Sequence, residues 1–226
     1  MRQKPMQWKA ALFDLDGVVF DTEPQYTVFW GEICRQYHPE IPGLENRIKG
    51  QTLTQIFDAY FADNEAARRD VVSRLDQYEA GMSYDYIRGF VDFIQDLRSH
   101  GVATALVTSS NHAKMASVYR SRPELPRLFD IVLTSEDFSE SKPSPDCYLK
   151  AAERFGAQRQ QCIVFEDSFN GLRSGKSAGM AVVGLTTSNS RESISDLCDV
   201  AVSDFSEIVF DDCLEVLARH NAPCDD

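Results

Sequence analysis

Two aspartates near the start of the chain, Asp14 and Asp16, are the first residues whose types and spacing suggest chemistry. They stand where the apolar run 10–15, long enough for one buried strand, should end. Side chains two residues apart on an extended strand lie on the same face, so we expect both carboxylates to point to one place. Two acids in such a position indicate a metal site, a nucleophile, or a nucleophile beside a general acid.

Three further groups of polar residues follow later apolar runs. They are Thr108 and Ser109 after the run 102–107, Lys142 after the run 131–133, and Glu166 with Asp167 after the run 162–165. In an open α/β sheet, ligands bind in the crevice beyond the carboxyl ends of the strands. We therefore expect all of these side chains to gather with Asp14 and Asp16 at one edge of a sheet.

Such a gathering of residues would suit the transfer of a phosphoryl group. Carboxylates from Asp14 and Asp167, a backbone carbonyl and waters form the oxygen-only donor set that Mg²⁺ prefers. With Mg²⁺ and Lys142 neutralising the phosphate, Asp14 can attack phosphorus and form an aspartyl-phosphate. Asp16 can protonate the leaving oxygen and later deprotonate the attacking water, which is worth roughly 10²–10⁴-fold in rate. The Thr108 hydroxyl and free backbone N–H groups can hold the phosphate.

Each group taken alone also has a simple structural interpretation. A D-x-D pair occurs in solvated turns and in other metal sites, and Thr108 with Ser109 could cap a helix. Lys142 could be an exposed lysine in a turn, and the acidic pair at 166–167 could favour a helix N-terminus electrostatically. Their shared position after strands, in this order along the chain, favours phosphoryl chemistry over these alternatives.

The elements that must position these residues alternate along the chain. The apolar runs, with a fifth at 181–185, are separated by amphipathic helical patterns such as 90–97 and 148–155. Strands that alternate with helices predict βαβ units and a mainly parallel sheet. The fold class is therefore expected to be α/β.

One interval interrupts this alternation. The 85 residues between Asp16 and Val102 contain no convincing strand pattern. Instead, apolar residues follow helical spacing over 26–37, 53–61 and 71–82. The simplest account is a helical cap inserted after the first strand, which would lie over the strand ends. We place this cap at 23–88 and the catalytic core at 1–22 and 89–226.

The composition excludes several classes of function. The 226-residue chain has a formal net charge of −12, which argues against nucleic acid as the main partner because that binding needs Lys and Arg. No apolar run approaches the roughly 20 residues of a membrane span, and no signal peptide is evident. The six cysteines form no C-x-x-C pair, which favours reduced thiols. We expect a cytoplasmic protein, a monomer or weak homodimer, that binds a small phosphorylated metabolite and neither nucleic acid nor membrane.

Taken together, the four groups resemble the four sequence motifs of the haloacid dehalogenase (HAD) superfamily. The stretches 13–24, 107–110, 141–146 and 165–168 are similar to the first, second, third and fourth motifs. The helical insert resembles the cap of the branch that holds β-phosphoglucomutase and the sugar-phosphate phosphatases. The resemblance covers nearly the whole chain, and it implies a Rossmann-like core: a mainly parallel sheet with helices on both faces, below the cap.

The resemblance also implies a role for each candidate residue. Asp14 would be the nucleophile and Asp16 the acid–base. Thr108 and the Ser109 backbone would hold phosphate, and Lys142 would steady both the phosphate and the nucleophile. Mg²⁺ would be the cofactor, bound by Asp14, Asp16 (through its carbonyl), Asp167 and, directly or through another ligand, Glu166. Members that release halide or cleave a C–P bond lack an aspartate at the position of Asp16, so its presence favours phosphate esters.

Two departures from the β-phosphoglucomutase pattern favour a phosphatase over a mutase. Tyr26 stands where that pattern has a histidine, and the Lys49-Gly50 pair is not followed by the usual arginine. Tyr26 leaves the handling of the leaving group open in either enzyme, and Arg88, where relatives usually have proline, would contact substrate or solvent. A non-catalytic phosphate-binding protein is disfavoured because all three essential aspartates are present. We predict a Mg²⁺-dependent phosphatase that hydrolyses a small phosphorylated metabolite, a sugar phosphate, through an aspartyl-phosphate.

Overall fold

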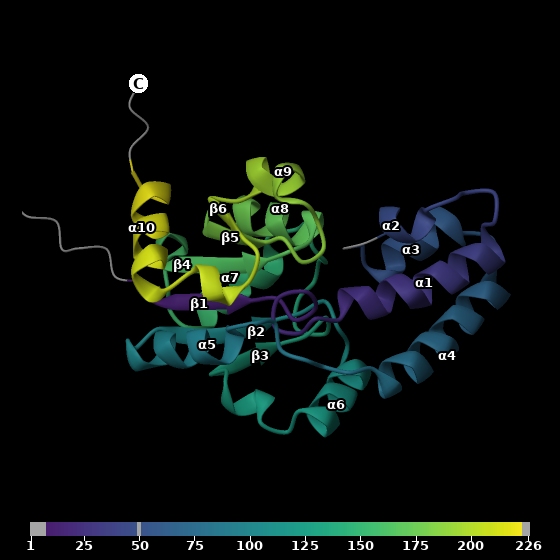
Figure 1. The fold of residues 1–226 in the computed structure, drawn as a ribbon, viewed down its shortest axis with the longest axis horizontal. Helices are drawn as coiled ribbons and strands as arrows, with labels where there is room; N and C mark the ends of the chain where they lie inside the picture. The colour runs from purple at the N-terminus through teal and green to yellow at the C-terminus, as the bar shows by residue number, and fades with distance from the viewer. Residues whose placement is uncertain (1–7, 49–50, 223–226) are drawn as a thin grey trace, which may run out of the picture.

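Six parallel strands form the centre of the computed structural model, which describes residues 8–48 and 51–222 (Figure 1). The strands are β1 (Ala10–Phe13), β2 (Ala103–Val107), β3 (Ile131–Leu133), β4 (Cys162–Glu166), β5 (Ala181–Leu185) and β6 (Val200–Val202). They lie in the order β3-β2-β1-β4-β5-β6, so β1 is central, and Leu12 pairs with Ala105 on one side and Val164 on the other. All neighbouring strands are parallel, which confirms the predicted α/β class.

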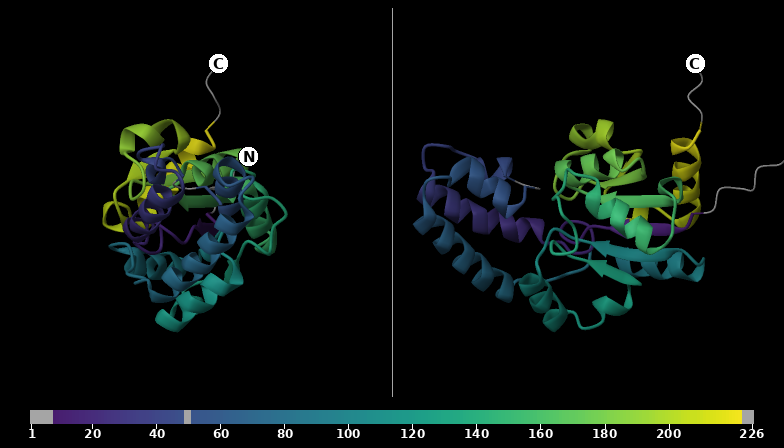
Figure 2. Two further views of the ribbon diagram at one scale, coloured as in Figure 1. Left: turned by 90° about the vertical axis from the view of Figure 1, so that its right-hand side faces the viewer. Right: turned by 180° about the vertical axis from the view of Figure 1, so that it is seen from behind.

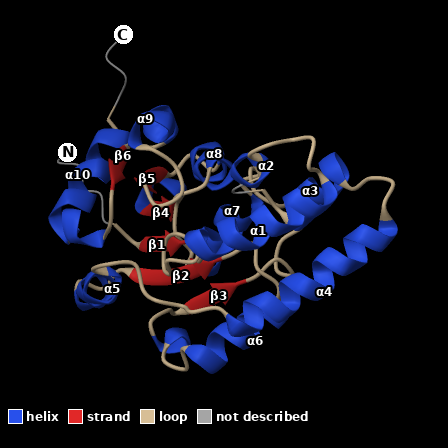
Figure 3. Ribbon diagram, turned by 45° about the vertical axis from the view of Figure 1, so that its right-hand side comes forward, coloured by secondary structure: helices blue, strands red, loops and turns tan. Residues whose placement is uncertain are grey.

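Helices cover both faces of this sheet, as predicted (Figure 3). They are α5 (Phe90–Ser99), α6 (His112–Ser121), α7 (Asp146–Arg154), α8 (Phe169–Ser177), α9 (Arg191–Ile194) and α10 (Phe210–His220). Short 3₁₀ helices connect them at Leu125–Arg127, Arg159–Gln161, Ser195–Leu197 and Phe205–Glu207. Successive strand residues point to opposite faces, so Phe13 packs in the cluster with α5 and α10, whereas Leu12 packs in the cluster with α7 and α8. Because both faces are covered, the central strands are continuous apolar runs.

The observed strands differ from the predicted ones in a few places. β1 ends at Phe13, two residues before the predicted end, because the chain turns sharply through Gly17, whose φ is +74°. β4 continues by one residue to Glu166, and β2 begins at Ala103, one residue later than predicted. β6 (Val200–Val202), which lies at one edge of the sheet, was not predicted. β3 and β5 coincide with their predicted runs.

The interval after β1 folds into helices, as predicted, although the short helix α2 was not expected. They are α1 (Glu23–Tyr37), α2 (Leu44–Arg47), α3 (Leu53–Tyr60) and α4 (Glu65–Gly81), which we call the cap. These helices bury a hydrophobic cluster of their own, which includes Phe29 and Ile33. Figures 1 and 2 place them beyond the carboxyl ends of the strands, at the end of the molecule opposite α10. Met82, Tyr84 and Ile87, although they fall within the predicted cap at 23–88, pack in the cluster of the core. The division into a cap at 23–88 and a core at 1–22 and 89–226 stays a proposal.

The two chain segments that enter and leave the cap lie side by side. Phe20 and Tyr86 form an antiparallel bridge, and the Asp21 N–H donates to the Asp85 carbonyl at 2.9 Å. This pairing joins the loop between β1 and α1 to the segment between α4 and α5, and so anchors the insertion to the core. The attachment positions the cap over the strand ends from which the candidate residues come.

No helix in residues 8–48 and 51–222 is long and apolar enough to cross a membrane. Five cysteines in this part of the chain are buried free thiols, at positions 34, 147, 162, 198 and 213. Cys224, the Lys49-Gly50 pair and the first seven residues lie outside the described residues. The predictions made for those segments therefore rest on the sequence alone.

Candidate active site

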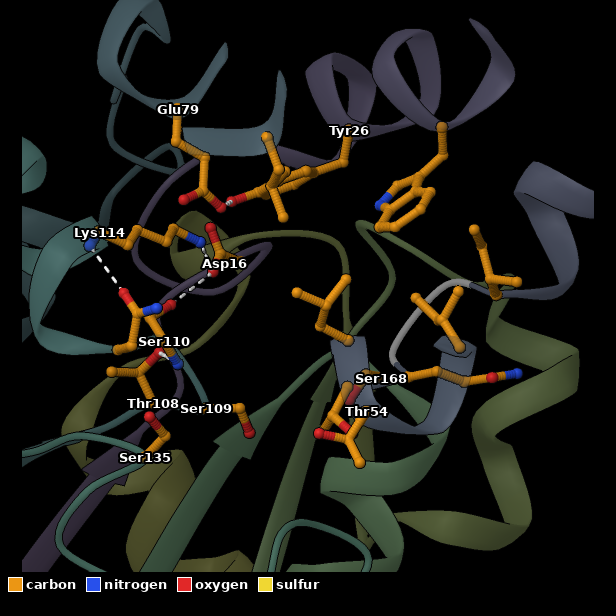
Figure 4. A pocket seen from close by; sticks show the side chains of 18 of the residues that line it. Asp16, Tyr26, Thr54, Glu79, Thr108, Ser109, Ser110, Lys114, Ser135 and Ser168 are labelled. Atoms are coloured by element: carbon orange, nitrogen blue, oxygen red, sulfur yellow. Dashed lines mark hydrogen bonds and ion pairs between the residues drawn. The ribbon is translucent and has the colours of Figure 1, made fainter. Parts of the chain in front are cut away.

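A pocket of about 420 Å³ lies between the carboxyl ends of the strands and the cap (Figure 4). Six of the seven candidate residues line it: Asp14, Asp16, Thr108, Ser109, Lys142 and Asp167. The seventh, Glu166, is fully buried and forms an ion pair with Lys142. The structure thus brings together the residues that were expected to meet at this edge of the sheet, although the role of each stays a proposal.

Asp14 follows β1 directly, and the sheet holds it in place. Its N–H donates to the Phe165 carbonyl of β4 at 3.1 Å, so strand pairing continues one residue past the end of β1. The side chain is 14% exposed, and its carboxylate accepts a hydrogen bond from the Lys142 ammonium at 2.6 Å. Burial raises the pKa of Asp14 to about 7, against the opposing effect of Lys142. A cation bound beside the carboxylate would lower this pKa and keep the carboxylate charged.

Lys142 reaches the centre of the site from the loop after β3. Besides Asp14, its buried ammonium donates to Glu166 Oε1 at 2.7 Å and to the Val107 carbonyl at 3.1 Å. Burial alone would lower the pKa of Lys142, but the carboxylates of Asp14 and Glu166 raise it well above its usual value, so the side chain stays charged. Tyr148 on α7, which the sequence analysis did not single out, donates to the same Glu166 oxygen at 2.9 Å. Glu166 is therefore a fixed anchor for the lysine.

Three carboxylates form a potential metal site. One oxygen from each of Asp14, Glu166 and Asp167 lies within 4.8 Å of the others. Among the ion pairs of the described residues, one ammonium, that of Lys142, faces these three carboxylates. With all three ionised, two negative charges would lie unbalanced in a buried place, and burial accordingly raises the pKa of Asp167 well above its usual value. Unbalanced buried charge is costly, and oxygen-only ligands suit hard divalent ions, so the donor set fits one such cation.

Gly17 allows the loop after β1 to pass against this carboxylate cluster. Its φ of +74° lies in the left-handed region, and a Cβ at this position would lie 2.0 Å from Asp167 Oδ2. The Gly17 N–H donates to the Phe20 carbonyl at 2.8 Å, which closes the loop tightly. Only a residue without a side chain fits there. The metal contact expected of the Asp16 carbonyl, in the same loop, stays a prediction.

Thr108 and Ser109 follow β2, next to the beginning of α6. Thr108 is buried, and its hydroxyl oxygen accepts a hydrogen bond from the Ser110 N–H at 3.0 Å, which leaves its own proton free to donate. Asn111 caps α6, since its side chain accepts a hydrogen bond from the Lys114 N–H at 2.9 Å. The hydroxyls and the positive end of this helix therefore lie at the part of the pocket where we expect phosphate.

Three hydrogen-bond donors surround the Asp16 carboxylate, and Figure 4 shows two of them, Ser110 and Lys114. Thr22 Oγ1 donates at 2.7 Å, Ser110 Oγ donates at 3.4 Å, and the Lys114 ammonium forms an ion pair. The sequence analysis missed Lys114, whose side chain is 7% exposed, because lysines in amphipathic helices usually lie in solvent. Its spacing of four residues from the buried Val118 is a signal that could have placed it on the inner face of α6.

Tyr26, whose role the sequence left open, lies against this lysine. The Lys114 ammonium is 4.8 Å from the centre of the Tyr26 ring, and the Tyr26 hydroxyl donates to Glu79 Oε1 at 2.7 Å. Tyr26 belongs to α1 and Glu79 to α4, so two cap helices reach the surroundings of Asp16 (Figure 4). Arg88, by contrast, is exposed and is not among the described residues that line the pocket. The geometry favours contact with solvent for Arg88.

The cap also contacts the other side of the site. Gln55 in α3 donates to the Lys142 carbonyl at 3.4 Å and accepts a hydrogen bond from the Asn170 side chain at 3.3 Å. A capping box between Thr52 and Gln55 explains why α3 begins there. Of the described cap residues that line the pocket, four are acidic and none is basic: Glu23, Glu45, Asp76 and Glu79. The leaving group of a substrate would meet these carboxylates together with threonine hydroxyls and Trp30.

Three comparisons with known proteins bear on this site. A family model described as haloacid dehalogenase-like hydrolase matches residues 8–179. Validoxylamine A 7'-phosphate phosphatase from Streptomyces hygroscopicus subsp. limoneus is 27% identical over 209 residues, which cover 89% of this chain and 96% of the relative. Fructose-1-phosphate phosphatase YqaB from Escherichia coli (strain K12) is 28% identical over 187 residues, which cover 78% and 96%. A crystal structure of β-phosphoglucomutase from Clostridium difficile matches with a TM-score of 0.77 at 21% identity, covering 94% of this chain and 98% of that one, which shows a shared fold.

Proposed function

Because the chain belongs to the haloacid dehalogenase-like hydrolase family, as its motifs predicted, we propose that it is a Mg²⁺-dependent phosphatase of a small sugar phosphate. The position of Asp14 carries the proposal: its buried carboxylate contacts the Lys142 ammonium and belongs to a cluster whose charge fits a divalent cation. Asp16 lines the same pocket with a separate set of partners. This arrangement supports a nucleophile distinct from the acid–base, as hydrolysis through an enzyme-bound intermediate requires.

The proposed reaction has two steps at Asp14. In the first, a carboxylate oxygen of Asp14 attacks phosphorus, the bond to the leaving oxygen breaks, and Asp16, which enters this step in its protonated form, transfers its proton to that oxygen. In the second, Asp16 takes a proton from the water that attacks the aspartyl-phosphate, and the free carboxylate of Asp14 is restored. Lys142 neutralises the phosphate through both steps, and Thr108 with the Ser109 backbone holds it. Mg²⁺, when bound, would supply further positive charge beside the phosphoryl oxygens.

The relatives and the cap side of the pocket support a phosphorylated carbohydrate as the substrate. Two relatives are named as phosphatases of validoxylamine A 7'-phosphate and of fructose 1-phosphate. Carboxylates and hydroxyls on the cap suit the hydrogen bonds of sugar hydroxyls, and Trp30 offers an apolar aromatic surface. The acidic side chains also disfavour a leaving group with a second phosphate, since like charges repel. This supports the phosphatase over the β-phosphoglucomutase-like phosphomutase, whose intermediate carries two phosphates.

A panel of phosphorylated metabolites tests the substrate class. Release of inorganic phosphate is measured in the presence of Mg²⁺ for hexose and pentose phosphates, β-glucose 1-phosphate and pyrophosphate. We expect steady release from at least one sugar monophosphate. Conversion of β-glucose 1-phosphate into glucose 6-phosphate, with little free phosphate, would overturn the choice of a hydrolase.

Replacing Asp14 with Asn tests the nucleophile. The amide keeps the size of the side chain but loses the charge and the nucleophilic oxygen, so we expect turnover to fall by roughly 10³-fold or more. Circular dichroism should show an unchanged fold. Glu215→Gln, which removes an exposed carboxylate from α10, is the matched control and should keep full activity. Undiminished hydrolysis by Asp14→Asn would refute the aspartyl-phosphate mechanism.

We also propose that the protein is a cytoplasmic monomer or weak homodimer whose partner is this metabolite. The net charge of −12 speaks against a nucleic-acid partner. The cysteine spacing, without a C-x-x-C pair, is typical of a reducing compartment. Size-exclusion chromatography with light scattering measures the oligomeric state, and a stable tetramer would contradict the proposal.

A further inference from the structure

The acid–base carboxylate of Asp16 is connected to the cap through three side chains. Lys114 on α6 forms an ion pair with Asp16, and its ammonium lies over the ring of Tyr26 on α1. The Tyr26 hydroxyl donates to Glu79 on α4 at 2.7 Å. We call Lys114, Tyr26 and Glu79 the acid–base support. Figure 4 shows the three side chains and Asp16 together on one side of the pocket, away from Ser168 and Thr54 on the other.

The support holds Asp16 more firmly than its two neutral donors can. Thr22 and Ser110 are neutral donors, whereas Lys114 is a cationic donor, whose hydrogen bond is charge-assisted and therefore the stronger one. A lysine side chain loses considerable conformational entropy when it is fixed. Contact with an aromatic face offsets part of that loss, and Tyr26 supplies such a face.

The support is split between the core and the cap. Lys114 and Asp16 belong to the core, but Tyr26 and Glu79 reach Lys114 from two different cap helices. The Tyr84 hydroxyl donates to the Glu79 carbonyl at 2.9 Å, which fixes the end of α4 beside the segment that returns to the core. A change in how the cap sits on α6 would therefore change the surroundings of Lys114, and through it the orientation of Asp16.

We propose that Lys114 is the positioning residue of Asp16, and that Tyr26 and Glu79 make this positioning depend on a docked cap. The inference rests on the proposed function, because it assigns a task to residues around its acid–base. Protonation of the leaving oxygen then becomes efficient only when the cap lies over the substrate. Tyr26 connects the other two residues of the support: its ring lies against the Lys114 ammonium, and its hydroxyl donates a hydrogen bond to the Glu79 carboxylate.

Lys114→Met tests the positioning role, because methionine keeps an unbranched apolar side chain and removes the charge. The measurement is kcat/KM for an alkyl phosphate and an aryl phosphate, since this ratio reports steps up to departure of the leaving group. An alkyl leaving oxygen needs a proton, whereas an aryl oxygen departs as a stable anion. We expect a loss of roughly 10–10²-fold for the alkyl ester, within the range of acid–base catalysis, and little change for the aryl ester. Lys114→Arg should restore most of the loss.

Lys176→Met is the matched control. Lys176 on α8 forms an ion pair with Asp199 at 2.8 Å and is not among the described residues that line the pocket. The same substitution there should leave the ratio of the two kcat/KM values unchanged. Equal losses of kcat/KM for both esters in Lys114→Met would overturn the inference but would not contradict the proposed phosphatase function. If the wild-type protein hydrolyses neither ester nor any sugar phosphate, the proposed function itself fails.

Tyr26→Phe and Glu79→Gln test the connection to the cap, and both keep the shape of the side chain. Each should lower kcat/KM for the alkyl ester by a few-fold and spare the aryl ester. Combined with Lys114→Met, neither should cause a further loss, because residues that act through one another are non-additive. Additive losses, or no loss in either single variant, would overturn the connection. These two variants also decide the question if Lys114→Met does not fold.

Discussion

Three buried carboxylates share one ammonium in this protein. Asp14, Glu166 and Asp167 lie together, and Lys142 contacts the first two. A buried charge without a partner destabilises the folded state, so the excess charge at this place has a consequence for stability as well as for chemistry. A bound divalent cation would offset it. The free energy of unfolding should therefore respond to the metal even in the absence of substrate.

Asp167→Asn should reduce that response. Binding of a cation to the folded state alone raises the unfolding temperature with concentration, so we expect Mg²⁺ to stabilise the wild-type protein. The variant lacks the charge of one proposed metal ligand, so Mg²⁺ should raise its unfolding temperature much less. Thermal unfolding at increasing Mg²⁺ concentration measures both. Glu215→Gln removes one carboxylate at an exposed place on α10 and should respond like the wild type. An equal gain in Asp167→Asn would exclude Asp167 from the metal site.

At the scale of elements, the loop after β1 decides where the carboxylates of Asp14 and Asp16 lie. The strand ends at Phe13, and the turn at Gly17 brings the backbone against Asp167. Asp14 stays within the strand pairing, whereas Asp16 lies in the loop and finds partners on α6. One tight turn thus places Asp14 and Asp16, which are only two residues apart in the chain, in different surroundings.

Gly17→Ala should disturb this turn through two effects. A side chain in the left-handed region costs about 1–2 kcal/mol, and the new Cβ would clash with Asp167 Oδ2. Gly101→Ala isolates the first effect, because Gly101 has a φ of +76° and nothing within 4 Å of a Cβ. We expect both variants to lose stability in urea unfolding, but only Gly17→Ala to bind Mg²⁺ more weakly. Equal metal affinities in titration calorimetry would show that Gly17 is needed for its backbone conformation alone.

At the scale of the whole molecule, contacts far from the pocket hold the layers together. Asp199 accepts hydrogen bonds from Lys176 of α8 at 2.8 Å, from the Val182 N–H of β5 at 2.7 Å and from His220 of α10 at 3.1 Å. It thereby joins helices on both faces to the edge of the sheet. Burial alone would raise the pKa of Asp199, but these hydrogen bonds outweigh it and hold the pKa below its usual value.

Asp199→Asn should lower the free energy of unfolding by an amount that depends on pH, because it removes the charge of the Asp199 carboxylate. Because the folded-state pKa is lowered, the carboxylate stabilises the fold fully above its unfolded pKa, and the contribution disappears as the pH falls through the folded pKa. The wild type should exceed the variant in unfolding free energy at about pH 6, and the difference should shrink towards about pH 2. Urea unfolding across this range measures the difference, with the exposed Asp196→Asn as control. A difference that is constant with pH would contradict the assignment.

The sequence by itself determined the fold class and the place where the candidate residues meet. Parallel strands share one direction, so polar residues that directly follow them must lie at the same edge of the sheet. For this reason the positions of Asp14, Thr108 and Asp167 could be predicted together. Lys142 reaches the same edge from the loop after β3, and the helical cap followed from the long interval without strands. β6 was not predicted.

Only the tertiary structure decided which side chains surround these residues. Lys114, Tyr26 and Glu79 come from three helices and meet because those helices pack, which no local pattern records. Packing also buries Glu166 beneath the pocket and gives it Tyr148 as a partner. The physical reason is that strand direction fixes where a chain segment ends, whereas burial and partners depend on distant segments that arrive only when the chain has folded.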